Sequence, residues 1–271
     1  MKVILSRKGF DSANGGIVSP IFEDGTMISF PIPCEMDGDT YSDLVYREKS
    51  YSEILKDLHY KGDVYNCHVD PDLDMQRRKE KIDGWFPALG QINASASYLI
   101  KNIRVAPKDL FLFFGNFHYV EDVGGSYQYM RNSGDFYRDS DLQVIWGYLQ
   151  VGEIITKPDE QQAMAWHPHS QDYRTKNQTN VIFKAAEKLS FDESKCGAGL
   201  LTFDKKRVLT LEGASKATWK MNKVYDVDHI NGKRKNRAKD PNKGIYYSGI
   251  WQELGLEESK ECFFWAKNIV L

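Results

Sequence analysis

Short apolar runs alternate with polar, glycine-containing turns along the whole chain, which is typical of strands joined by loops. Two continuous apolar runs, residues 109–115 and 144–155, have the length and composition of buried strands. Asp24-Gly25 has the composition of a hairpin turn, so the N-terminal region is predicted to be a β-meander. Shorter strands are predicted at residues 3–5, 17–22, 27–32, 64–69, 180–185, 200–203 and 208–211.

Helical spacing of apolar residues is confined to a few segments. Residues 50–59 predict a helix that Ser52 could cap, and residues 91–103 predict a second one. Residues 119–140 and 226–249 are polar and predict long loops. No repeat and no clear linker divides the chain, so we expect an α+β, β-rich mixed fold in which residues 1–271 form one domain.

Composition narrows the class of protein without identifying a partner. Thirty-six Lys and Arg face 38 Asp and Glu, which gives a net charge of −2. A hydrophobic content of 41% excludes a disordered chain, and no apolar run approaches the roughly 20 residues of a membrane span. The polar start argues against a secretory signal, so a cytoplasmic protein is expected. Four scattered cysteines exclude a disulfide framework.

Histidines and aspartates form the strongest candidate for chemistry. His68, Asp70 and Asp72 alternate with one residue between them, so His68 and Asp70 would project from one face of a strand. Such a set could act as catalytic acid and base groups, or it could only make hydrogen bonds in a turn. His167 and His169 flank a proline far along the chain. Combined in space, His68, Asp70, His167 and His169 would hold a divalent metal such as Fe, Mn or Zn.

The same pattern suggests a minor alternative, an iron and 2-oxoglutarate dioxygenase. Those enzymes use a His-x-Asp motif with a distant histidine, and they usually carry Arg or Lys about ten residues after it. Asn177 and Thr179 occupy those positions here, so the fit is incomplete.

Basic residues gather in two places. Arg7 and Lys8 open a glycine-containing loop that could hold a phosphate, although an exposed turn explains it equally well. A second basic run could contact a nucleic-acid backbone or be a solvated loop. Its candidate binding residues are Lys233, Arg234, Lys235 and Arg237.

Several of these segments, taken in order, resemble the third family of nucleotide-modification-associated domains. The resemblance implies a part in bacterial or phage systems that modify nucleic-acid bases, with nucleotides, nucleic acid or other proteins of such a system as partners. The central strands are also similar to PUA-like domains of the EVE and ASCH groups, which implies a small barrel with flanking helices around residues 105–157. The first resemblance rests on residues 1–12, 15–21, 24–25, 31–33, 68–73, 109–115, 147–154, 167–169 and 252–253.

Two functions therefore remain open from the sequence. One is an enzyme that acts on a nucleotide or a modified base through the His/Asp site, with or without a metal. The other is a reader that binds a modified base in DNA or RNA without turnover. A purely structural role in a modification complex is the third alternative.

Overall fold

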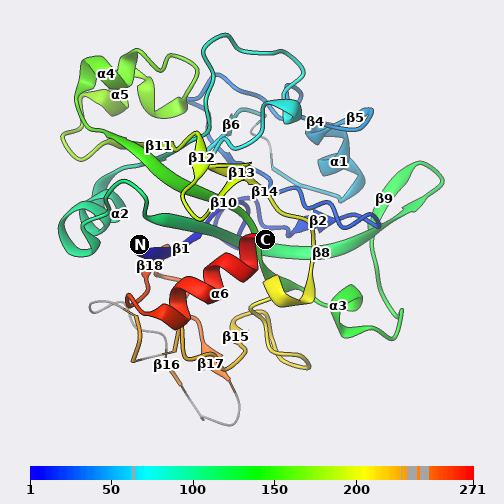
Figure 1. Cartoon of the computed structure of the whole chain (residues 1–271). Helices are drawn as coiled ribbons and strands as arrows, with labels where there is room; N and C mark the ends of the chain where they lie inside the picture. The colour runs from blue at the N-terminus through cyan, green and yellow to red at the C-terminus, as the bar shows by residue number, and fades with distance from the viewer. Residues whose placement is uncertain (63–64, 227, 231–236, 239–243) are drawn as a thin grey trace.

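A nine-stranded mixed sheet forms the centre of the computed structural model, which describes residues 1–62, 65–226, 228–230, 237–238 and 244–271 (Figure 1). β1 and β2 run parallel to β8, and the other pairs in this sheet are antiparallel. The predicted α+β, strand-rich class is confirmed. The main path through the sheet runs in the order β18 (Glu253–Gly255), β1 (Val3–Arg7), β8 (Leu110–Val123), β10 (Leu142–Ile155), β11 (Val181–Ala185) and β7 (Ala88–Gln91). Three further strands pair with this path: β2 (Ser19–Ile21) and β9 (Ser126–Tyr129) with β8, and β14 (Ala198–Leu200) with β10.

The two longest strands, β8 and β10, form the core of this sheet. Both carry continuous apolar runs, and residues 110–120 and 142–151 are buried throughout. β8 runs further than the sequence predicted and pairs with β9, so part of the predicted 119–140 loop is a hairpin. The hairpin forms because Tyr119 and Val120 continue the buried pattern and Gly124-Gly125 supplies two positive-φ residues at its turn.

Smaller sheets surround the central one. The pair β3 (Ile32–Pro33) and β6 (Cys67–His68) positions one candidate site residue, because it ends at His68. The strands predicted at 27–32 and 64–69 are thus much shorter than expected. The remaining strands are β4 (Val45–Tyr46) with β5 (Lys49–Ser50), β12 (Lys188–Leu189) with β13 (Asp192–Cys196), and β15 (Thr218–Trp219) and β16 (Arg237–Ala238) on either side of β17 (Ile245–Tyr246).

Most helices are short and lie around the sheet (Figure 1). α1 (Tyr51–Asp57) is capped by Ser50, not Ser52, through a reciprocal capping box with Glu53. The predicted helix 91–103 is α2 (Asn93–Ser97) followed by a π-helical segment (Tyr98–Ile103). The others are α3 (Phe136–Asp139), α4 (Pro158–Gln162), α5 (Asp172–Thr175) and 3-10 turns at Met75–Arg77, Pro168–Ser170 and Lys205–Arg207.

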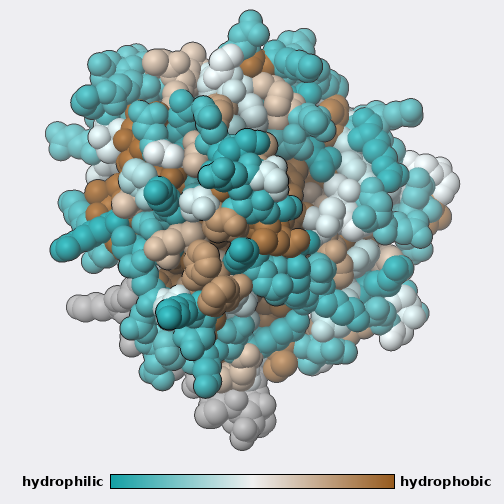
Figure 2. Space-filling view, in the orientation of Figure 1, coloured by the Kyte–Doolittle hydropathy of each residue, from teal (hydrophilic) through white to brown (hydrophobic). Residues whose placement is uncertain are grey.

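The last helix, α6 (Lys260–Val270), packs against β1 and was not predicted. It buries Cys262, Ala266 and Ile269, which recur every three or four residues. Figure 2 shows mainly hydrophilic side chains on this face of the molecule, with apolar ones gathered near its centre where α6 lies. Among the described residues, no helix has the length and apolarity needed to cross a membrane.

Candidate metal centre and its pocket

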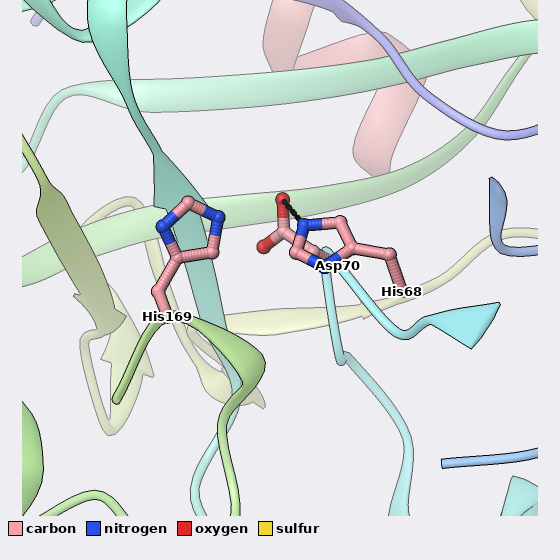
Figure 3. A group of neighbouring side chains, drawn as sticks. All are labelled: His68, Asp70 and His169. Atoms are coloured by element: carbon pink, nitrogen blue, oxygen red, sulfur yellow. Dashed lines mark ion pairs between the residues drawn. The ribbon is translucent and has the colours of Figure 1, made fainter. Parts of the chain in front are cut away.

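Three side chains from distant parts of the chain meet in one cluster (Figure 3). His68 ends β6, Asp70 follows two residues later, and His169 lies in the 3-10 turn Pro168–Ser170. One ligand atom from each residue lies within 4.8 Å of the other two, and the three together could hold a metal ion. The structure therefore brings His169 together with His68 and Asp70, which lie about a hundred residues earlier in the sequence.

His68 is held by a buried carboxylate behind it. Its Nδ1 lies 2.7 Å from Asp37 Oδ2, and Arg174 and the Tyr173 hydroxyl also donate to Asp37. Burial alone would raise the pKa of Asp37, but His68 and Arg174 hold it below its usual range. Because a carboxylate only accepts, Nδ1 of His68 carries the proton, and its Nε2 lone pair is left for the cluster.

The Nδ1 of His169 is also held by a hydrogen bond, but its partner is an amide oxygen and not a carboxylate. Its Nδ1 lies 2.6 Å from Asn180 Oδ1, while the Asn180 amide nitrogen donates to Gln161 Oε1 and to the His169 carbonyl. The amide oxygen must therefore accept from Nδ1–H, which leaves Nε2 of His169 unprotonated. Burial, together with His167 and His68, lowers the pKa of His169 to about 3 against the opposing effect of Asp70. Both histidines are thus held from behind through Nδ1, and their Nε2 atoms are the candidate ligand atoms.

Asp70 is buried and is the only carboxylate of the three-residue cluster. Its Oδ1 accepts from the Gly90 N–H at 2.5 Å, and its Oδ2 lies 3.1 Å from Lys8 Nζ. Burial would raise the pKa of Asp70, but Lys8 and the nearby imidazoles hold it well below its usual value. Asp70 is therefore ionised at neutral pH, as a metal ligand must be.

His167 lies beside the cluster. Its Nδ1 accepts the His169 backbone N–H at 3.1 Å, and its Nε2 lies 3.5 Å from Asp70 Oδ1. This Nε2 is buried and makes no hydrogen bond among the described residues. The role of His167 as a metal ligand stays a prediction.

Asp72 is not brought into the cluster. Its buried Oδ2 accepts from Arg78 Nε at 3.0 Å and Nη2 at 2.8 Å, and from Trp85 Nε1 at 2.8 Å. The physical reason is charge, because a buried carboxylate needs a cationic partner and Arg78 supplies it. Geometry therefore separates Asp70, at the cluster, from Asp72, which is bound in an ion pair.

The cluster forms part of the wall of a pocket of about 540 Å³, a volume suited to a small organic ligand. The loop after β1, the turn between β7 and α2, and residues 250–252 before β18 complete its lining. Arg7 and Lys8 both line the pocket. Arg7 pairs with Asp11 at 3.3 Å, and Lys8 pairs with Asp70.

The second basic run is not placed by the structure. Lys233, Arg234 and Lys235 lie outside the described residues, and Arg237 is described only as backbone in β16. Their part in nucleic-acid binding remains a prediction.

Sequence reasoning missed the residues that hold the ligands in place. Asp37 and Asn180 lie in no motif with the histidines they hold, and each comes from a distant or irregular segment. Gly90 is the one such residue that the sequence weakly indicates, since an isolated glycine in a strand often marks a place where another group packs closely against the backbone. A Cβ at Gly90 would lie 2.2 Å from Cδ2 of His169, so only glycine allows the ring to pack there.

The fold and the cluster together define an α+β protein with two histidines and one carboxylate that could bind a metal at the edge of a pocket. Comparison with known families adds the second step. The chain matches nucleotide modification associated domain 3 over residues 2–254, and it therefore belongs to this family, as the sequence resemblance predicted. No curated protein and no solved structure matches the chain.

Proposed function

We propose that this protein is a metal-dependent enzyme that acts on a nucleotide or on a base of a nucleic acid. The observation that carries the proposal is the convergence of two fixed Nε2 lone pairs and the ionised Asp70 beside a pocket. Membership of a family associated with nucleotide modification supplies the substrate class. We also propose that residues 1–271 form one domain.

Each residue has a defined part in this proposal. His68, Asp70 and His169 hold the cation, and nitrogen and oxygen donors suit Fe, Mn or Zn. A divalent cation would supply Lewis-acid chemistry at the pocket wall. Arg7, whose side chain lines the pocket, binds the phosphate of the substrate.

The proposal is tested by metal binding and turnover in the same protein. We expect Zn²⁺, Mn²⁺ or Fe²⁺ to bind at one site in isothermal titration calorimetry, and His68→Ala and His169→Ala each to lower the affinity by at least tenfold. His59→Ala, at an exposed histidine outside the pocket lining, is the matched control. Deoxynucleotides and a DNA oligonucleotide, incubated with the metal-loaded protein, should give a changed base or nucleotide by mass spectrometry.

The proposal is wrong if no metal binds and both alanine variants retain full function in cells. The second candidate, a non-catalytic reader with a PUA-like core around residues 105–157, is favoured by one observation. Trp251 and two glutamines line the pocket, as a base-binding site requires. A reader would bind nucleic acid with a salt-dependent affinity and convert none of it.

A further inference from the structure

One wall of the pocket is made of amide side chains whose orientation is fixed. Gln91, the last residue of β7, is 5% exposed and follows Gly90, whose N–H binds Asp70. Its Nε2 donates to Glu253 Oε1 at 2.6 Å, and Glu253 is fully buried. The hydroxyl of Ser6 donates to the same carboxylate oxygen at 3.0 Å.

The hydrogen bond to Glu253 determines which way the Gln91 amide points. Because the Nε2 of Gln91 donates to Glu253, the carbonyl oxygen of Gln91 points away from this carboxyl group. Among the described residues, no donor contacts Oε1 of Gln91, and this atom is not among the buried atoms left without a partner. Gln91 itself lines the pocket.

A second amide group comes from the residue before Glu253. Gln252 also lines the pocket. Its Oε1 accepts from the Ser95 hydroxyl at 3.1 Å, so its Nε2 faces away from Ser95 and makes only a long contact of 3.5 Å with the Arg7 carbonyl. The contact between Gln91 and Glu253 brings the segments of the two glutamines to the same pocket, although 161 positions separate the glutamines in sequence.

We propose that Gln91 and Gln252 read the hydrogen-bonding edge of a nucleobase, and that Glu253 is the positioning residue that fixes the Gln91 amide. This inference rests on the proposed function, because it takes the ligand to be a nucleotide. The edge of each base offers an N–H donor beside an oxygen or nitrogen acceptor, which complements an amide oxygen beside an amide N–H. Trp251 lines the same pocket and gives the base an aromatic surface.

The experiment compares nucleotides with a ligand that has no base. Affinities for dAMP, dCMP, dGMP, dTMP and 2-deoxyribose 5-phosphate are measured by calorimetry without metal. We expect at least one nucleotide to bind the wild-type protein more than tenfold tighter than the sugar phosphate. Gln91→Met should lower that preference about tenfold, through the loss of one hydrogen bond, and leave the affinity for the sugar phosphate unchanged.

Three further variants keep the test specific. Gln252→Met removes the amide donor and should reduce the same preference for a nucleotide over the sugar phosphate. This variant tests the inference on its own if Gln91→Met, at a buried position, does not fold. In Glu253→Gln the new amide N–H can donate to the Gln91 oxygen and turn the Gln91 amide around, so this variant should weaken the preference without altering the pocket volume. Gln128→Met, at an exposed position of β9 outside the pocket lining, should keep the wild-type preference.

The outcomes separate the two proposals. If no nucleotide binds more tightly than deoxyribose 5-phosphate, the base-edge inference is wrong, while metal binding and turnover still decide the proposed function. If nucleotides bind tightly but Gln91→Met and Gln252→Met both keep the wild-type preference, only the inference about the glutamines is wrong.

Discussion

Replacing Lys8 with methionine tests whether the cluster is suited to a cation. Lys8 Nζ lies 3.1 Å from Asp70 Oδ2, and both side chains are buried. Methionine has a side chain of similar length and apolar character to the lysine stem but carries no charge, so the Asp70 carboxylate loses its cationic partner. Breaking a buried ion pair costs about 3–5 kcal/mol. At about 2–4 °C per kcal/mol, the Tm of the metal-free variant should fall by roughly 6–20 °C.

A divalent cation should restore much of this stability. At a concentration 100 times its Kd, a metal that binds only the folded protein stabilises it by about 2.7 kcal/mol. The gain in Tm on adding Zn²⁺ should be larger in Lys8→Met than in the wild type, because the lysine ammonium no longer repels the metal next to Asp70.

The assay is thermal unfolding followed by circular dichroism, with and without ZnCl₂. Lys157→Met is the matched control, since Lys157 pairs with Glu160 at 2.6 Å on the exposed surface and such pairs contribute little. An equal Zn²⁺ gain in Lys8→Met and wild type, or no gain in either, would refute the reasoning. Asp70 would then serve only as the partner of a structural lysine.

Three further predictions concern the surroundings of the cluster. Asp72→Asn should destabilise the fold but leave Zn²⁺ affinity unchanged, since Asp72 binds Arg78; a tenfold loss in calorimetry would contradict this. Gly90→Ala should displace His169 and weaken Zn²⁺ binding about tenfold or more, and an unchanged affinity would count against the packing argument. The pKa of His169 is about 3 when folded and about 6.5 when unfolded, so the unfolded chain binds the extra proton between these values. The free energy of unfolding should therefore fall as the pH falls from about 6.5 toward 3, by at most about 1.4 kcal/mol per pH unit. Chemical denaturation of His169→Gln should show a smaller decrease in the free energy of unfolding over this range, and a decrease equal to that of the wild type would exclude His169 as its cause.

The residues of the candidate metal cluster could be predicted from sequence because local spacing carries the information. His68 and Asp70 are two residues apart, and His169 lies in a short histidine-proline motif. The groups that fix them could not be predicted this way, because Asp37 and Asn180 share no local motif with the histidines that they hold, and their own partners come from other segments. Asp37 and Arg174, for example, are 137 residues apart. Long-range contacts of this kind depend on the packing of whole elements, which no short pattern encodes.

The same contrast holds for the fold. The continuous apolar runs of β8 and β10 identify buried strands directly, because burial on both faces leaves no polar alternation. α6 was missed although Cys262, Ala266 and Ile269 have helical spacing, since three consecutive aromatic residues, 263–265, interrupt the pattern. Phe264 is 64% exposed, so hydrophobicity alone misidentifies the buried side of this helix.

The charges around the cluster link the metal to the substrate. Asp37 and Asp70 are balanced by Arg174 and Lys8, so these four side chains sum to zero before any ligand binds. A divalent cation adds two positive charges to a buried site, which is unfavourable in a low dielectric. A phosphate monoester carries about −1.5 to −2 charges at pH 7 and would enter through the pocket that Arg7 lines. Under the proposed function each ligand would thus reduce the charge penalty of the other, and the metal would raise the affinity for the nucleotide by the same factor as the nucleotide raises that for the metal.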